Sequence, residues 1–362
     1  MQETVILTQD LMRFKTTQSE PDEIQHCIAF IEAYLNKCGA KYQRLDYNRI
    51  PSIIVMPENN VAPILLMSHI DVVDGPDELF RPHLKDNALY GRGSIDDKYA
   101  AALSLVLVKN YLQRLKKAGQ SQNDLPFGVL ITADEETGGT NGVCKVLEKI
   151  TAEFCIALDG GSLQKIVTKE KGIVRLKLVA SGKTAHGARP WLGENAIENL
   201  IDDFRLLKTK FELSAPDHWH RTLNFSRIKG GKAINQVPDY AEALFDIRYT
   251  ENDDMETIFQ NIQDEIKGEL IVEKKEPLFQ GGDSPYLDLL LEIAKDTEVG
   301  FEHGASDARF LSAHGIKGIV WGADGDMSQH SADEHVNIDS VYKLYALLDE
   351  FIKRSKALVS KK

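Results

Sequence analysis

Five short segments of the sequence combine histidine or acidic side chains in arrangements that could hold metal ions. His69 and Asp71 follow an apolar run. Alternate residues of a strand share one face, so His69 could bind a metal through one ring nitrogen while Asp71 accepts a hydrogen bond from the other. The remaining candidates come from four later segments and are Asp96, Glu135, Glu136, Asp159 and His330.

Each of these segments also has a simpler interpretation. Asp96 and Asp97 precede a helical pattern and could cap its N-terminus. The neighbouring acids Glu135 and Glu136 could belong to a solvated loop. Together, however, two histidines and several carboxylates placed mostly after predicted strands suit divalent zinc. The chain contains no G-x-S-x-G, H-E-x-x-H or G-x-G-x-x-G motif, so a serine nucleophile, a zincin site and a dinucleotide site are not predicted.

The elements that must position these residues are of the α/β type in the first half of the chain. Two amphipathic helical patterns cover 22–38, which stops at Gly39, and 99–115. Continuous apolar runs, the pattern of strands buried on both faces of a sheet, occur at 52–56, 64–67, 127–132 and 154–158. Several candidate ligands therefore follow strand ends, which is where α/β proteins assemble their active sites.

The pattern changes to half-exposed strands at about Gly172. Strict alternation of apolar and polar residues, interrupted by two amphipathic helices, gives the order β-α-β-β-α-β, the ferredoxin-like unit. A helix at 285–295, a strand at 318–321 and a helix at 340–356 then resume the α/β pattern. The sequence thus predicts a small domain at 172–276 inserted into a larger one made of 1–171 and 277–362.

Composition excludes several classes of function. The 362 residues are enough for two domains, and 43 basic against 55 acidic residues give a net charge of −12, so a nucleic-acid partner is not expected. The four cysteines form no C-x-x-C pair, which favours reduced thiols in a cytosol. No signal peptide or membrane-spanning apolar run is visible. A cytoplasmic protein without a membrane partner is therefore expected.

At the level of whole motifs, the sequence resembles a family of di-zinc amidohydrolases and peptidases. The family includes acetylornithine deacetylase, succinyl-diaminopimelate desuccinylase, glutamate carboxypeptidase, aminoacylase and zinc dipeptidases. The motifs that carry the resemblance occur in order along nearly the whole chain: S-H-x-D-V-V, G-R-G-x-x-D-x-K, D-E-E-x-G-G, G-K-x-A-H-G, N-x-V-P, S-D-A-R-F and H-S-x-x-E-H-V.

The resemblance assigns a role to each candidate residue. It implies two zinc ions, replaceable by cobalt or manganese in vitro, that Asp96 would bridge. Glu136 and His330 would complete one site, and His69 and Asp159 the other. Asp71 would support His69, and Glu135 would be the general base that takes a proton from a zinc-bridging water and passes it to the leaving nitrogen. The Asp96–Asp97 peptide bond would be cis.

The resemblance also implies a zinc-peptidase-like three-layer catalytic domain and an inserted lid through which two subunits form a homodimer. His186 of the lid would stabilise the oxyanion in the neighbouring subunit's active site, although a histidine at the end of such a strand is usually just exposed. Asn235, Arg248 and Arg309 match positions that contact substrate. For Arg248, an ion pair with a neighbouring acid is an equally good interpretation.

One departure affects the substrate. Many deacylases of the family have Glu-Pro where this chain has Asp159-Gly160, and an aspartate there is commoner in aminopeptidases and dipeptidases. The sequence predicts a zinc-dependent hydrolase that cleaves the linear amide bond of an N-acyl amino acid or a short peptide. A dipeptidase or aminopeptidase using the same site is the alternative. A non-catalytic scaffold is disfavoured because Glu135 and all five ligands are present.

Overall fold

The chain divides into two compact units in the computed structural model, which describes residues 2–57 and 60–359. One unit comprises Met1–Lys169, Gln280–Glu302 and Ser306–Lys362, and the other comprises Glu170–Phe279 together with His303–Ala305. The second unit is therefore inserted into the first. The insertion predicted at 172–276 lies within it, and the short return at His303–Ala305 was not predicted.

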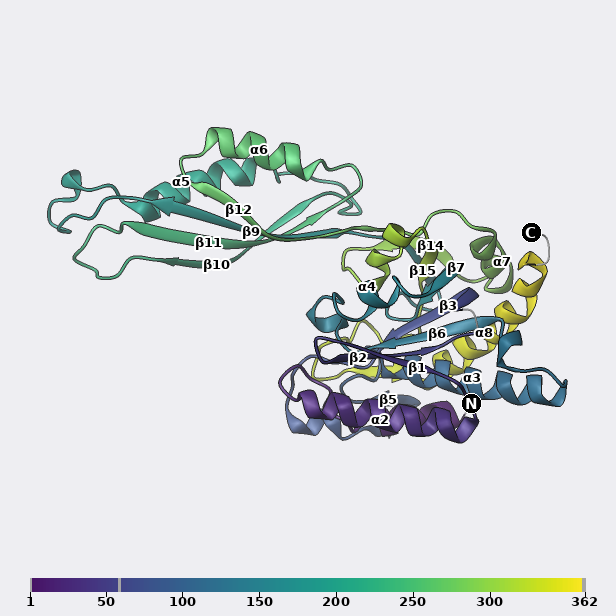
Figure 1. Cartoon of the computed structure of the whole chain (residues 1–362). Coiled ribbons are helices and arrows are strands. Elements are labelled where there is room, and N and C mark those ends of the chain that lie inside the picture. The colour runs from purple at the N-terminus through teal and green to yellow at the C-terminus, as the bar shows by residue number, and fades with distance from the viewer. Residues whose placement is uncertain (1, 58–59, 360–362) are drawn as a thin grey trace. The chain divides into compact units, whose positions relative to one another are not determined.

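A nine-stranded sheet forms the centre of the first unit (Figure 1). Its strands are β1 (Gln43–Tyr47), β2 (Ile50–Val55), β3 (Val61–His69), β6 (Phe127–Thr132), β7 (Thr151–Ala157), β8 (Lys165–Glu170), β13 (Phe279–Gln280), β14 (Glu298–Glu302) and β15 (Lys317–Val320). They run in the order β1-β2-β6-β3-β7-β15-β8-β13, and β14 pairs with β8. The central strands β6, β3, β7 and β15 are parallel neighbours, so their carboxyl ends meet at one edge.

Helices cover both faces of this sheet, and α4 lies on the opposite side from α2 and α3 (Figure 1). The helices of the unit are α1 (Gln2–Met12), α2 (Pro21–Cys38), α3 (Lys98–Lys117), α4 (Val143–Val146), α7 (Pro285–Ile293) and α8 (Ile338–Val359). Helix α2 buries its apolar stripe and ends at Gly39, whose φ of 70° is the left-handed conformation that glycine adopts without a steric penalty. The predicted helix and its stop signal are confirmed.

A small sheet in the first unit was not predicted. It contains β4 (His83–Lys85), β5 (Ala88–Tyr90) and β16 (His335–Asn337) in the order β16-β5-β4. Because β5 pairs with β16, segments that are about 245 residues apart in the chain lie side by side.

Single-turn 3-10 helices occur in both units, at Asp77–Phe80, Gln122–Asp124, Glu135–Thr137, Pro190–Leu192, Asp307–Phe310 and Ser312–His314.

The second unit is an antiparallel sheet with two helices. Its elements are β9 (Gly172–Ser181), α5 (Ala196–Thr209), β10 (Thr222–Gly230), β11 (Tyr240–Tyr249), α6 (Met255–Glu265) and β12 (Glu269–Glu276). The strand order β10-β11-β9-β12 is that of a ferredoxin-like fold, and the predicted order β-α-β-β-α-β is confirmed. Alternate residues of β9, among them Val174 and Leu176, pack with Leu200 and Leu207 of α5.

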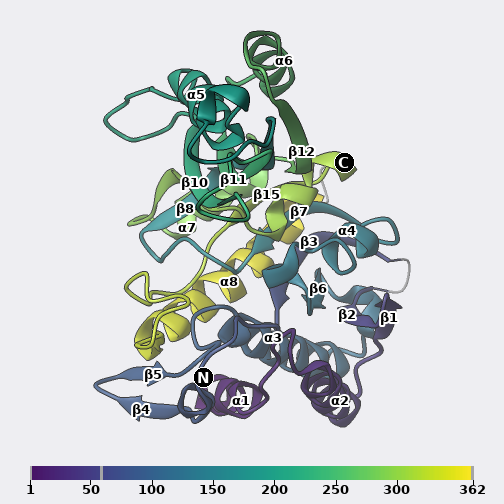
Figure 2. The ribbon, with the colours of Figure 1, turned by 90° about the vertical axis from the view of Figure 1, so that its left-hand side faces the viewer.

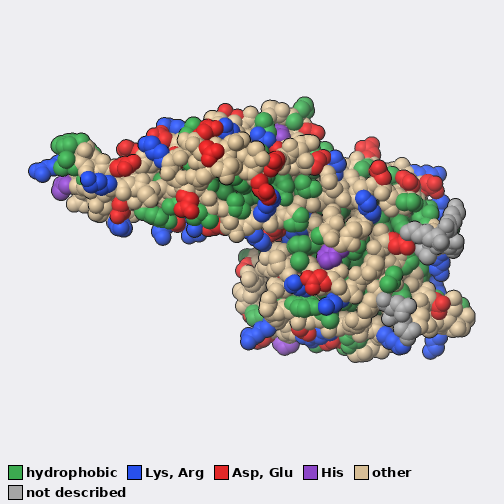
Figure 3. All heavy atoms as spheres, turned by 45° about the horizontal axis from the view of Figure 1, so that its top comes forward, with side chains coloured by type: hydrophobic (Ala, Val, Ile, Leu, Met, Phe, Trp, Pro, Cys, Tyr) green, Lys and Arg blue, Asp and Glu red, His purple; other side chains and the backbone are tan. Residues whose placement is uncertain are grey.

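Acidic and basic side chains are interspersed on the face shown in Figure 3. Within 2–57 and 60–359, no helix combines the length and the apolar character needed to cross a bilayer.

Candidate metal centre

The register of the parallel strands brings the candidate ligands to one edge of the sheet. His69, the last residue of β3, pairs with Thr132, the last residue of β6, so Glu135 and Glu136 follow directly beside it. On the other side of β3, Met67 pairs with Ala157, which places Asp159 level with His69. Residues that are up to 90 positions apart in the chain therefore meet because parallel strands share an edge.

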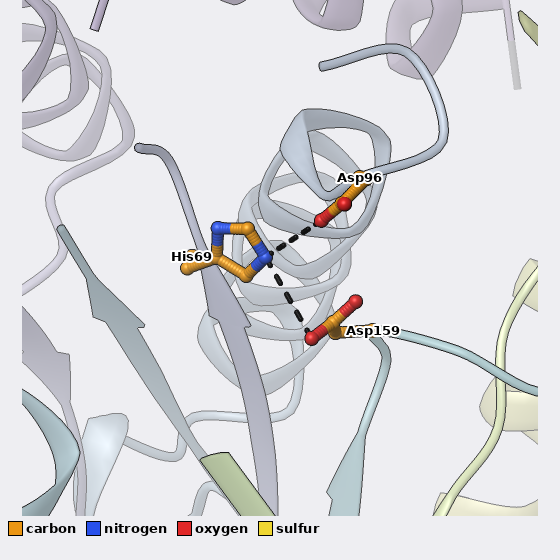
Figure 4. A group of neighbouring side chains, drawn as sticks. All are labelled: His69, Asp96 and Asp159. Carbon is orange, nitrogen blue, oxygen red and sulfur yellow. Dashed lines mark ion pairs between the residues drawn. The ribbon is translucent and has the colours of Figure 1, made fainter. Parts of the chain in front are cut away.

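The first group of ligands contains His69, Asp96 and Asp159 (Figure 4). The His69 Nε2 atom lies 2.9 Å from Asp96 Oδ1 and 3.7 Å from Asp159 Oδ2. Nε2 is buried and makes no hydrogen bond, whereas Nδ1 lies 3.0 Å from the backbone oxygen of Asp71. Because Nδ1 is held by that oxygen, Nε2 is the ring atom that faces the two carboxylates and would bind a metal.

The second group contains Asp96, Glu136 and His330. The His330 Nε2 atom lies 3.0 Å from Asp96 Oδ2 and 3.1 Å from Glu136 Oε1. Asp96 thus offers one carboxylate oxygen to each group. In both groups the ligand atoms lie within 4.8 Å of one another. All five predicted ligands are brought together, and Asp96 occupies the central position.

The electrostatics show how strongly these groups interact. Hydrogen bonds that the His330 ring donates to the carboxylates of Asp96 and Glu136 raise its pKa to about 10. Burial alone would raise the pKa of Asp96, but the two histidines hold it well below its usual range. Burial raises the pKa of Glu136, and His330 opposes that shift. In the absence of metal, protons on the two imidazoles therefore compensate the clustered carboxylates.

The donor set fits two divalent cations. It consists of imidazole nitrogens and carboxylate oxygens, which suit zinc, cobalt and manganese. The clearest sign is the buried Nε2 of His69, which makes no hydrogen bond although carboxylate oxygens of Asp96 and Asp159 lie near it, because a cation between these atoms would satisfy all of them. The three carboxylates of the two groups balance most of the charge that two such cations would bring.

Asp71 contacts both His69 and the turn that carries Glu135 and Glu136. The His69 ring bonds the backbone oxygen of Asp71, and the nearest carboxylate oxygen lies 3.4 Å from Nδ1. The carboxylate also accepts the backbone N–H groups of Glu135 at 3.2 Å and Glu136 at 3.0 Å. It therefore contacts His69 and fixes the turn at 135–137 at the same time.

Glu135 lies beside the ligands and faces a buried arginine. Arg309 Nη1 is 3.6 Å from Glu135 Oε1, and Arg309 Nη2 is 3.7 Å from Asp307 Oδ1. Burial raises the pKa of Glu135 well above its usual range, and the carboxylates of Asp159 and Asp307 add to this shift. The Arg309 side chain is only 3% exposed, so the predicted contact with substrate is not evident, and its role in substrate binding stays a prediction.

Asp97 does not cap α3, so the capping interpretation of this position is wrong. It stands before the helix without a side-chain bond to it, and its Oδ2 accepts the backbone N–H of His69 at 3.4 Å. The Asp96–Asp97 peptide bond is cis, as the resemblance implies. The two adjacent acids therefore face the strand end that carries His69.

Residues that sequence reasoning left without a role support the ligand loops. The Tyr99 hydroxyl donates to the Leu158 oxygen at 2.6 Å and accepts the Ala323 N–H at 2.9 Å, next to Asp159. Arg92 and Glu334 form a buried ion pair between the loops of Asp96 and His330. Arg92 belongs to the G-R-G motif and Glu334 to the H-S-x-x-E-H motif, and these motifs were the available indication in the sequence that both residues could serve the site.

The candidates in the second unit are described separately. His186 and Asn235 are exposed and adjacent, since His186 bridges Gln236 and the Gly187 N–H donates to the Asn235 oxygen at 2.7 Å. Arg248 pairs with Asp246, its Nε lying 2.9 Å from Oδ1. The alternative interpretation of Arg248, an ion pair, is therefore confirmed, while contact of any of these residues with substrate stays a prediction.

Comparisons with known proteins identify a family and a fold. The family model described as peptidase family M20/M25/M40 matches residues 65–354. Among curated proteins, a succinyl-diaminopimelate desuccinylase of Wolbachia pipientis subsp. Culex pipiens (strain wPip) is 27% identical, covering 96% of this chain and 92% of its own.

Two solved structures show the same fold across nearly the whole chain. A tripeptidase from Staphylococcus aureus subsp. aureus Mu50 has a TM-score of 0.78 at 20% identity, covering 97% of each chain. A dinuclear metal binding peptidase of the M20 family from Bacillus subtilis has a TM-score of 0.64 at 14% identity, again covering 97% of each chain. The α/β fold with an inserted domain, expected from the sequence, is confirmed.

Proposed function

The chain belongs to the peptidase family M20/M25/M40, and on that basis we propose that it cleaves the linear amide bond of an N-acyl amino acid or a short peptide. Membership makes it a metal-dependent amidohydrolase of a family that binds two metals. The observation that carries the proposal is the pair of His–carboxylate groups that share Asp96. Substrate, metal identity and the roles of individual residues belong to the proposal.

Two divalent cations, zinc under our proposal, would be held by His69 and Asp159 on one side of Asp96 and by Glu136 and His330 on the other. Bound there, they would lower the pKa of the attacking water and polarise the scissile carbonyl. Cobalt or manganese would fit the same nitrogen and oxygen donors in vitro.

Glu135 is the general base in this proposal. It adjoins the ligand Glu136, and its raised pKa suits a carboxylate that must accept a proton near neutral pH. It would take the proton of the attacking water and deliver it to the leaving nitrogen. Asp71 fixes the backbone of Glu135 through a hydrogen bond, so the base is held by its main chain rather than by a flexible loop.

Two substrate classes are each favoured by a different observation. The desuccinylase relative supports an N-acyl amino acid, such as acetylornithine or succinyl-diaminopimelate. Asp159 at a ligand position, followed by Gly160, supports a dipeptidase or aminopeptidase, and the structural likeness to a tripeptidase agrees with this alternative. Hydrolysis rates for acyl amino acids, dipeptides and tripeptides, measured with each of zinc, cobalt and manganese, decide between the classes.

A homodimer formed through the second unit is also part of the proposal. This unit exposes large apolar side chains, including Trp191, Ile228 and Ile234, which a monomer would leave in water. His186 of the partner subunit would then act on the oxyanion. Sedimentation of the purified protein gives the oligomeric state, and a monomer at micromolar concentration rejects this part of the proposal.

A further inference from the structure

Arg92 and Glu334 connect the two loops that carry Asp96 and His330. Arg92 lies four residues before Asp96, and Glu334 lies four residues after His330. Arg92 Nη1 contacts Glu334 Oε2, and the two side chains are 4% and 0% exposed. An ion pair removed from water in this way loses hydration that its own attraction often does not recover, so stability alone is a poor reason for it.

Each member of the pair also bonds the backbone of the other loop. Glu334 Oε1 accepts the Gly93 N–H at 2.7 Å, and the Glu334 backbone oxygen accepts the Gly91 N–H at 2.9 Å. In return, Arg92 Nη2 donates to the backbone oxygen of His330 at 3.3 Å. These bonds fix the separation of the two loops from both sides.

The pair extends the small sheet toward the metal centre. Strand β5 pairs with β16 up to Tyr90 and His335, and Figure 2 shows the β4–β5 hairpin of this small sheet. Next to that last pair, the ion pair between Arg92 and Glu334 links the same two chain segments. The His330 backbone then adopts a left-handed φ of 62°, which is uncommon for a residue with a side chain and needs support from its surroundings.

We propose that the Arg92–Glu334 pair, called here the loop clamp, is a positioning device that sets the distance between Asp96 and His330. It thereby determines the metal affinity of the group formed by Asp96, Glu136 and His330. The inference rests on the proposed dinuclear site. Among the described residues, the side chains of Arg92 and Glu334 bond each other, Gly93 and the His330 backbone but neither His69 nor Asp159, so the effect should fall on the metal that His330 holds.

Zinc titration of chelator-stripped protein by calorimetry tests the clamp. Glu334→Gln should leave the zinc affinity of one site at the wild-type value and weaken that of the other about 10- to 100-fold, which is the usual loss when a residue that supports a metal ligand is replaced. Because that variant leaves Arg92 buried without its partner and could fail to fold, the apolar double variant Arg92→Met with Glu334→Met is measured too, with the same expectation. The matched control is Arg114→Gln, which breaks the distant Arg114–Asp349 ion pair. It should bind both zinc ions with wild-type affinity.

A second titration shows which metal group responds. In a His330→Ala background the group of His69, Asp96 and Asp159 remains, and adding Glu334→Gln should leave its affinity unchanged. Three results would overturn the proposed role of the clamp but leave the dinuclear site standing. The first is a further loss of zinc affinity when Glu334→Gln is added to His330→Ala, and the second is an equal loss of affinity for both metals in Glu334→Gln alone. The third is two wild-type zinc affinities in the double variant Arg92→Met with Glu334→Met. A wild-type protein that binds fewer than two metals overturns the dinuclear site and the clamp with it.

Discussion

At the scale of single residues, ligand chemistry is decided by what each imidazole nitrogen contacts. The backbone oxygen of Asp71 occupies Nδ1 of His69 and leaves Nε2 for a metal. Nε2 of His330 likewise lies between two carboxylates, but its side chain is half exposed whereas that of His69 is buried. Solvent therefore reaches His330 more readily than His69.

Proton release should accompany metal binding at His330. Its pKa of about 10 means that the metal-free imidazole carries a proton at pH 7, and a metal requires the neutral ring. Affinity should consequently fall as the pH falls below 10, by up to about tenfold per unit for this group. Calorimetry in buffers of different ionisation enthalpy counts the protons released.

His330→Ala is the control for that proton count. The variant should release about one proton fewer per chain than the wild type. An unchanged count would mean that His330 is neutral before the metal binds, contrary to the carboxylate contacts described above.

Arg309 should affect turnover rather than substrate affinity. Its guanidinium faces Glu135 and Asp307, so Arg309→Gln removes the cation beside the base and should lower kcat by about 10- to 100-fold with little change in KM. Arg309→Lys keeps the charge and should recover part of the loss. A large rise in KM at unchanged kcat would instead support the sequence-based expectation that Arg309 binds substrate.

The ligands themselves could be predicted because their residue types and motif order are specific. The residues that hold them could not, since their partners are distant in sequence. Glu334 and Arg92 are 242 positions apart, and nothing local in either motif indicates a mutual contact. Asp71 was predicted to support His69 with its carboxylate, and the two backbone N–H groups from another loop that this carboxylate also accepts were not predicted.

At the scale of elements, long periodic segments were predicted well and short ones were missed. The strand at 127–132 and the helix ended by Gly39 agree with the structure because their patterns extend over several residues. Strands β4, β5 and β16 contain three residues each, too few to show alternation. The missed elements matter, since β5 and β16 bring the loops of Asp96 and His330 together.

Tyr99 should stabilise the contact between the segments that follow two strands of the large sheet. It is almost fully buried, and its hydroxyl joins the end of β7 to the segment after β15. Tyr99→Phe leaves the Leu158 oxygen and the Ala323 N–H without this partner, and should destabilise the metal-free protein by about 1–3 kcal/mol. Urea unfolding measures the difference.

Tyr345→Phe is the matched control for this substitution. Its hydroxyl also forms one side-chain hydrogen bond, from Asn110 Nδ2 at 2.7 Å, but the residue is partly exposed and water can replace the bond. The free energy of unfolding should therefore change less than for Tyr99→Phe. Equal losses in the two variants would show that the Tyr99 hydroxyl does not join these segments.

At the scale of the whole molecule, the predicted insertion accounts for the length of the chain, and the acidic excess is a property of the surface. Only five of the 55 acidic residues were assigned to the site, namely Asp71, Asp96, Glu135, Glu136 and Asp159. The dimer could not be derived from one chain. Its support is the exposed apolar surface of the second unit and the adjacent pair His186 and Asn235.

Mixed subunits test whether His186 acts across the dimer. Glu135→Gln and His186→Ala should each be inactive alone, but a mixed dimer would contain one site with Glu135 and the partner's His186. Random exchange should restore about a quarter of wild-type activity, because half of the dimers are mixed and each has one intact site. Activity that stays at the level of the single variants rejects the shared site.

The most direct test of the central claim is the metal content of Glu135→Gln measured together with its turnover. If Glu135 is the base and the five neighbouring residues are the ligands, the variant should retain two metals per chain and lose at least about 100-fold in kcat. Loss of a metal from the variant would show that Glu135 is a ligand. Wild-type turnover with both metals bound would show that the base lies elsewhere.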